Sequence, residues 1–347
     1  MGKHRRKLTG QRPVVISNVF ILRAKSYLGL TSYCTFASRG VGGVVAHQFM
    51  NQNIVACGHK VDIGTPVVLW DEGFACPNKR GRSTCSHHDP KLNDAPSRKD
   101  SAYKILNPES AYKELVQRVH QFVLHYDACY NSHHCHQLMT ESSFKGSHFY
   151  LDLDGTLYQT CDLYWKTNTA PADDRQGNER AIHVEMANLS WEALAKESEW
   201  LPSTKDKYRK KREQWVLELP KEHRGKVQTP GFQAIPSRAY GARGYFSKKI
   251  NGRVVRMWDF TEEQYQALIK LCIGINQLLP RVKLQVPFDK STGRHPLDRL
   301  KNYSKFSGIL GHAHVQKGGN GLECKHDPGS AFNWARLKKA LRRAAGG

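Results

Sequence analysis

Three residues that can bind a metal each stand where an apolar run ends or the chain turns. His125 follows the run QFVL, His312 follows GILG, and Asp327 follows a Cys-Lys-His turn and precedes Pro-Gly. A catalytic zinc ion (Zn²⁺) commonly takes three protein ligands and keeps its fourth position for water. Neutral imidazoles and one carboxylate meet that need, and ligands at strand ends are held in place by a sheet. Each residue taken alone is weak evidence, because a lone histidine is usually a hydrogen-bonded structural residue.

The segments around these candidates predict a mixed α/β region in which strands alternate with helices. FVLHYDA reads as a buried strand that carries His125. RAIHVEMA alternates apolar and polar residues, so it predicts a strand with Ile182, Val184 and Met186 on one face and His183 and Glu185 on the other. The further expected elements are helices at 111–121, 132–141, 261–279 and 331–343, and hairpins around Asp154-Gly155 and Asn251-Gly252.

The chain of 347 residues is long enough for one large domain or two smaller ones. Residues 1–110 contain short apolar runs bounded by Gly, Pro and Asn, which predicts a β-rich N-terminal region of unknown role that ends in a linker. Its polar stretch at 76–101 holds a Cys/His group that fits no common zinc module, namely Cys76, Cys85, His87 and His88. We expect residues 111–347, which hold the candidate metal ligands, to form a second domain that a charged insertion at about 189–240 interrupts, with some helix in that insertion.

The charge balance points to polyanionic partners. Lys plus Arg number 53 against 31 Asp plus Glu, a formal net charge of +22. Such a charge favours nucleic acid, an anionic membrane surface or an anionic cell-wall polymer as a partner. Sequence-specific nucleic-acid binding is disfavoured, because no basic helix shows base-reading periodicity. No apolar run approaches the ~18 residues of a membrane span. The basic N-terminus and the run VVISNVFIL favour a strand over a signal peptide.

Five motifs in chain order resemble the zinc-dependent type-2 N-acetylmuramoyl-L-alanine amidases, structural relatives of the peptidoglycan recognition proteins. They are FVLHYDA, SHFYLDLDGTLYQ, NERAIHVEMAN, GHAHVQ and KHDPGSAFNW, and they span roughly residues 111–343. The resemblance implies a central mixed β-sheet flanked by helices, with zinc in a groove at the end of the sheet. It also implies hydrolysis of the amide between N-acetylmuramic acid and L-alanine, with peptidoglycan or muropeptides as partners.

The resemblance assigns a role to five residues. His125, His312 and Asp327 match the family's zinc ligands, Glu185 matches its catalytic acid, and Lys325 matches the lysine two residues before the third ligand. In these roles Glu185 would move protons and Lys325 would stabilise the oxyanion. The family's substrate implies a location in the cell envelope or outside the cell, although no clear signal peptide stands at the N-terminus.

The chain also departs from the family pattern. A glycine-rich loop separates His312 from Asp327, so Cys324 and His326 compete with Asp327 as the third ligand. Tyr164-Trp165-Lys166-Thr167 stands where family members often carry Trp-His-Ala, and His183 replaces a common glycine. Two alternative functions stay open. One is a peptidoglycan-binding module of the same fold without turnover, and the other is an amidase that acts on a different amide.

Peptidoglycan recognition proteins carry a cysteine pair placed like Cys129 and Cys135, which flank the loop YNSHH. We therefore expect these two cysteines to lie close enough for a disulfide if the protein is exported. Two free thiols are the alternative for a protein that stays inside the cell.

Overall fold

The computed structural model describes residues 50–74, 105, 107–142, 145–189, 191–192 and 206–346. The expected strand VVISNVFIL and the Cys/His group at 76–88 lie outside the described residues.

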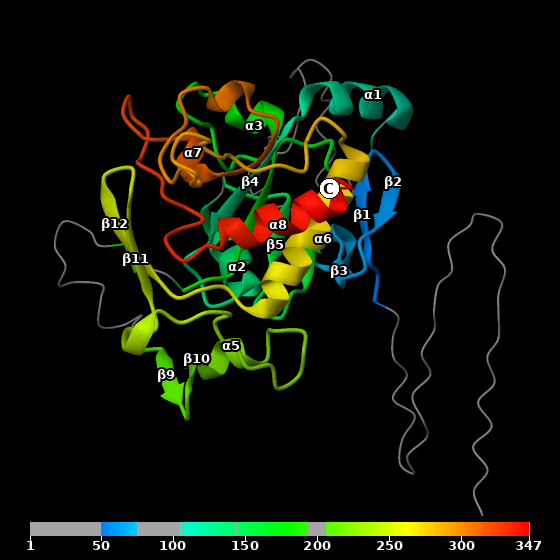
Figure 1. Ribbon diagram of the computed structural model, residues 1–347. Coiled ribbons are helices and arrows are strands. Elements are labelled where there is room, and N and C mark those ends of the chain that lie inside the picture. Colours follow the sequence, from blue (N-terminus) through cyan, green and yellow to red (C-terminus); the bar gives the residue numbers. More distant parts are fainter. Residues whose placement is uncertain are drawn as a thin grey trace, which may run out of the picture. The chain divides into compact units, whose positions relative to one another are not determined.

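A six-stranded mixed sheet forms the centre of the fold, in the strand order β13-β4-β7-β5-β6-β3 (Figure 1). Neighbouring strands from β13 to β5 run parallel, β5 and β6 are antiparallel, and β3 is parallel to β6. The β5–β6 connection contains Gly155 with φ +83°, so the predicted Asp-Gly hairpin is present. The strands are β13 (Gly308–Gly311), β4 (Gln121–Tyr126), β7 (Ala181–Met186), β5 (Phe149–Leu151), β6 (Leu157–Gln159) and β3 (Val67–Val68). The predicted mixed α/β class is confirmed.

The two faces of β7 have different neighbours. Ile182, Val184 and Met186 belong to the main hydrophobic core, together with residues of α6 (Glu262–Leu278) and α8 (Trp334–Ala344). Figure 1 shows α6 and α8 side by side across this face of the sheet. Side chains alternate along a strand, so His183 and Glu185 lie on the opposite face, as predicted. His125 shares that opposite face, since it pairs with Glu185 in the β4–β7 register.

The remaining helices are short or lie at the periphery of the sheet. Helix α6 begins with a capping box in which Thr261 accepts a hydrogen bond from the backbone N–H of Gln264, as its sequence predicts. The others are α1 (Pro108–Arg118), α2 (Ser132–Ser142), α3 (Gly177–Arg180), α5 (Lys221–Arg224), α7 (His312–Val315) and the 3₁₀ turns η1 (Trp70–Glu72), η3 (Gly241–Arg243) and η4 (Tyr303–Lys305). Among the described residues, none of these helices is long and apolar enough to cross a membrane.

Residues 50–74 share the core of the central sheet. Their hairpin, β1 (Asn53–Ala56) and β2 (His59–Asp62), contributes Ile54 to the main hydrophobic cluster, and Ile63, which follows β2, adds to it. Strand β3 adds the edge of the sheet. The role that we expect for region 1–110 as a whole remains a prediction.

The described part of the charged insertion contains more strand than helix. Its sequence DKYRKKREQW forms the hairpin of β9 (Tyr208–Lys211) and β10 (Gln214–Leu217). The short α5 is the helix that we expected somewhere in the insertion. The hairpin is held by packing: Tyr208 stacks on Trp258 with ring centroids 4.0 Å apart. A separate three-stranded sheet joins β8 (Trp191–Glu192), β12 (Arg253–Met257) and β11 (Phe246–Ile250).

Candidate metal centre

The structure brings together His125, His312 and Asp327, which come from three distant parts of the chain. Oδ2 of Asp327 lies 2.9 Å from Nδ1 of His125 and 3.0 Å from Nδ1 of His312. All three side chains are buried, and their ligand atoms lie within 4.8 Å of one another. The geometry suits a small cation with mixed nitrogen and oxygen ligands.

Gly311 permits this convergence. It ends β13 directly before His312, and a Cβ atom there would lie 2.4 Å from Cδ of Pro328 and 2.8 Å from the carbonyl oxygen of Asp327. The two ligand-bearing segments are also joined by the backbone, because the N–H of Ala313 donates to the carbonyl of Asp327 at 3.0 Å. A glycine at this position therefore lets the turn that carries Asp327 approach the end of the strand.

Each histidine of the triad has a second partner on its other ring nitrogen. Nε2 of His312 lies 3.2 Å from Oε1 of Gln316, whose amide nitrogen donates to the carbonyl of Glu323 at 2.9 Å. Nε2 of His125 lies 3.3 Å from Nδ1 of His183. These contacts direct Nδ1 of both rings towards Asp327, which is the usual way that outer residues orient metal-binding imidazoles. The i, i+4 spacing of His312 and Gln316 on one helical turn was an available signal that our reading of the sequence missed.

The charge states fit metal binding. Burial lowers the pKa of His125 to about 4, although Asp327 opposes the shift, so the ring is neutral near pH 7. Burial opposes ionisation of Asp327, but the two neighbouring imidazoles outweigh it and hold the pKa of this carboxyl well below its usual range. At neutral pH His125 therefore offers a neutral nitrogen ligand and Asp327 offers a carboxylate.

Glu185 lies beside the triad without belonging to it. Its Oε1 is 4.0 Å from Nδ1 of His125, and its side chain is buried. Burial first, then the charges of Asp327 and Asp127, raise the pKa of Glu185 well above its usual range. A buried carboxyl with a raised pKa next to a metal-ligand group is a typical proton-transfer candidate.

Lys325 is half-buried at the edge of the same group. Its ammonium lies 2.9 Å from the carboxylate of the exposed Glu323. Burial lowers the pKa of Lys325, but Asp327, Glu323 and Glu185 outweigh that effect, so the pKa is raised. The charge of Lys325 is thus felt at both Asp327 and Glu185.

Cys324 and His326, the two alternatives to Asp327 as third ligand, have other neighbours. The thiol of Cys324 lies 3.4 Å from the backbone carbonyl of Asn251. His326 is buried near Tyr126, with ring centroids 6.2 Å apart. Of the three candidates for the third ligand, only Asp327 belongs to the group with His125 and His312.

The other histidines near the site have structural partners. His148 is buried and its Nε2 lies 2.8 Å from the carbonyl of Trp165. His314 accepts from the N–H of Gly311 through Nδ1, and its Nε2 faces the carbonyl of Pro296 at 2.9 Å. His133 and His134 lie on α2 and contact the rings of Tyr158 and Tyr130.

Cys129 and Cys135 lie close together beside Asp127. Both cysteines are buried and carry free thiols, and with the Asp127 carboxylate their ligand atoms lie within 4.8 Å of one another. The expected proximity of the pair is therefore present, without a disulfide in this structure. Burial raises the pKa of the Cys135 thiol well above its usual range, which disfavours the reactive thiolate.

Residues 115–225 match the family model described as N-acetylmuramoyl-L-alanine amidase. The matched segment includes His125 and Glu185, whereas His312, Lys325 and Asp327 follow it in the chain. No curated protein sequence matches the chain significantly.

Two solved structures show a remote similarity. One is AmpDh3 from Pseudomonas aeruginosa in complex with anhydromuramic pentapeptide, at 14% identity and a TM-score of 0.34. The match covers 72% of this chain and 65% of that one, so less than two thirds of its length is spanned. The other is a selenomethionine derivative of AmpD, at 13% identity and a TM-score of 0.30, with 65% of this chain and 86% of that chain covered. Similarity at these TM-scores does not support the assignment of any residue at the site.

The family match and the ordered motifs around it agree on one assignment. Residues 115–225, which carry His125 and Glu185, are similar to the N-acetylmuramoyl-L-alanine amidase family.

Proposed function

We propose that this protein is a zinc-dependent peptidoglycan hydrolase. It cuts the amide bond between N-acetylmuramic acid and the L-alanine of the stem peptide. The observation that carries the proposal is the convergence of His125, His312 and Asp327 beside the buried Glu185, in a chain whose residues 115–225 match the amidase family.

The residues present fit a zinc ion. Two imidazoles and a carboxylate are a common set of three protein ligands for catalytic zinc. Gln316 and His183 occupy the remaining ring nitrogens of His312 and His125, which leaves Nδ1 of each ring for the metal. When bound, zinc supplies Lewis acidity, which makes water more acidic and polarises the scissile carbonyl.

The neighbouring side chains supply the rest of the chemistry. Glu185 takes a proton from the attacking water and later returns it to the amine that leaves. Its raised pKa suits the second step, because a carboxyl that keeps its proton can act as an acid. Lys325 places a positive charge where the carbonyl oxygen becomes negative, and such stabilisation is often the largest single catalytic effect.

The proposed partners are peptidoglycan and muropeptides. The test is to incubate the full chain with purified sacculi, with and without a chelator, and to identify the products by mass spectrometry. We expect stem peptides that begin with L-alanine and intact glycan strands, and no release in the presence of chelator. Binding without release would favour a binding module, and cleavage of another amide would overturn the proposed substrate.

We expect Lys325→Ala to lower turnover by ~10²-fold, because removal of one group that stabilises an oxyanion typically costs that much. Bound zinc and the melting temperature should change little, since Lys325 lies outside the triad and is half-exposed. Stem-peptide release from sacculi measures the effect. Lys317→Ala, an exposed lysine of the same loop, is the matched control and should keep normal turnover. Near-normal turnover of Lys325→Ala would show that Lys325 does not stabilise the oxyanion.

We expect Gln316→Leu to weaken zinc binding by ~10- to 100-fold, the usual cost of removing an outer partner of a metal ligand. Gln316→Glu keeps an oxygen for Nε2 of His312 and should lose less affinity. Competition with a zinc-binding dye measures both affinities without reference to activity. Equal affinity of Gln316→Leu and the parent protein would show that the contact does not orient His312.

A further inference from the structure

A second concave site lies along α8, separate from the metal triad. It is a pocket of about 900 Å³ between α8, the segment around residues 288–297 and Lys248 of β11. None of His125, His312 and Asp327 lines it. The volume is within the range of pockets that hold small molecules or a segment of a polymer. We call it the α8 pocket.

The lining of the α8 pocket is strongly cationic. It contains no aspartate or glutamate, and its cations other than Arg238 are Lys248, Arg294, Lys338, Lys339, Arg342 and Arg343. Within the described part of the chain, no carboxylate forms an ion pair with any of these six. A seventh cation, Arg238, is bound to the buried Asp259, with Nε 2.6 Å from Oδ2. Burial lowers the pKa of Lys248, the neighbouring charge of Arg238 lowers it further, and Asp259 opposes both effects.

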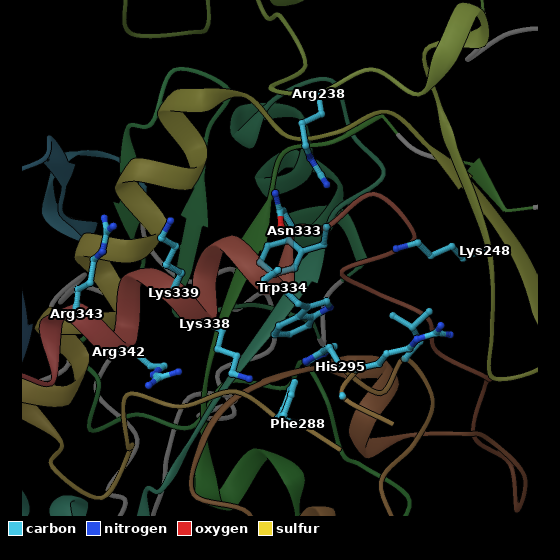
Figure 2. Close-up of a pocket in the computed structure, with 15 residues that line it drawn as sticks. Arg238, Lys248, Phe288, His295, Asn333, Trp334, Lys338, Lys339, Arg342 and Arg343 are labelled. Carbon is cyan, nitrogen blue, oxygen red and sulfur yellow. The ribbon is translucent and has the colours of Figure 1, made fainter. Parts of the chain in front are cut away.

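The cations follow the axis of α8 in two rows. Lys338 and Arg342 are four residues apart, as are Lys339 and Arg343, so each row spans ~6 Å along the helix. Figure 2 shows Lys339, Arg342 and Arg343 on one side of Trp334 and Lys248 on the other. The arrangement offers positive charge along a path, which suits a chain of negative groups better than one isolated anion.

Trp334 and Phe288, two aromatic residues of the pocket, already have partners at their rings. The ring of Trp334 is buried and stacks on His295, with centroids 4.0 Å apart and an interplanar angle of 16°. The ammonium of Lys338 lies 2.9 Å from the centroid of the Phe288 ring. Proteins that bind single-stranded nucleic acid stack the bases on open aromatic faces. Trp334 therefore offers no open face to a base, and Phe288, although 42% exposed, already has a cation over its ring. This arrangement favours a polyanion without bases.

We propose that the α8 pocket binds a polyol-phosphate chain of the cell envelope, a flexible polymer whose successive units are joined by phosphodiesters. The choice of envelope polymer rests on the proposed function, since the substrate of the metal centre is a wall polymer. Lys338, Lys339, Arg342 and Arg343 contact successive phosphates, and Arg294 and Lys248 hold the chain at the other wall of the pocket. Bound polymer keeps the enzyme at the wall without taking part in hydrolysis.

The test measures binding apart from catalysis. A fluorescently labelled synthetic glycerol-phosphate oligomer is titrated with the full chain, and anisotropy is followed over a range of salt concentrations. The variant Lys338→Gln/Lys339→Gln/Arg342→Gln should bind at least ~10-fold more weakly at low salt, with a shallower dependence of affinity on salt, because fewer counterions are released. The matched control Arg281→Gln/Lys283→Gln/Lys301→Gln removes the same charge from exposed positions outside the pocket and should bind within about twofold of the parent protein.

Three results would overturn the proposal. The control could lose as much affinity as the α8 variant, which would show a general effect of net charge. An oligothymidylate of equal charge could compete as well as the glycerol-phosphate oligomer, which would make the site a nucleic-acid site. The variant of the exposed pair, Arg342→Gln/Arg343→Gln, could bind like the parent protein. Both α8 variants should keep the parent rate on a soluble muropeptide, so failure of the proposed amidase activity would be seen separately in the parent protein.

Discussion

A Glu185→Gln protein should keep its fold and its zinc but release stem peptides ~10²- to 10⁴-fold more slowly, the range that a positioned general base contributes. The amide has nearly the shape of the carboxyl but cannot accept and return the proton. Glu185 is 4.0 Å from Nδ1 of His125 and lies outside the ligand group, so the metal site should persist. Peptide release from sacculi and zinc content give the two readouts.

Stability adds a further readout for Glu185. The raised pKa of this carboxyl shows that the metal-free fold resists its ionisation. An acid whose pKa is raised in the folded state loses stability as pH rises above its unfolded value, and glutamine removes that loss. The metal-free Glu185→Gln protein should therefore melt no lower than the parent at pH 7. Glu222→Gln, an exposed carboxylate on α5, is the control. Wild-type turnover in Glu185→Gln would assign proton transfer to another group, with His183 the next residue to test.

Asp327→Ala should lose nearly all bound zinc and all measurable turnover. The carboxylate provides the only oxygen ligand of the triad, and its removal leaves two imidazoles and a cavity between them. Loss of a ligand also removes the negative charge that holds His125 and His312 together. Metal analysis after dialysis measures the zinc content.

The competing ligands provide the control. Cys324→Ala and His326→Gln should keep full zinc occupancy, because the Cys324 thiol faces the carbonyl of Asn251 and His326 lies near Tyr126. If Asp327→Ala kept its zinc while Cys324→Ala lost it, the turn would have to present the thiol to the metal, and the third ligand would be reassigned.

Much of the local structure could be predicted from the sequence, because it depends on neighbouring residues. Asn251 and Gly252 have φ values of +47° and +88°, as the tight turn between β11 and β12 requires. Thr261 and Gln264 form the cap of α6 through contacts three residues apart. The alternation in RAIHVEMA placed Glu185 on the face opposite the core for the same reason, since the period of a strand is local.

The candidate ligands were predicted from the resemblance to known motifs, and a polyanionic partner was predicted from the net charge. The sequence left three residues open for the third ligand, because a Pro-Gly turn does not determine which side chain faces the strand. Gln316 and its contact with His312 were missed for a related reason: the helical turn at 312–315 depends on how the loop returns to Glu323.

Only the tertiary structure decided the features that join distant segments. The insertion forms the β9–β10 hairpin because Tyr208 packs on Trp258, a contact that outweighs the helical propensity of its lysines and arginines. Strand β3 became the edge of the sheet by pairing with β6, about ninety residues away in sequence. The α8 pocket needs a helix, a loop and a strand in one place. The charges of α8 can be read from the sequence. The segments that lie opposite them depend on long-range packing, because the residues buried together come from distant parts of the chain.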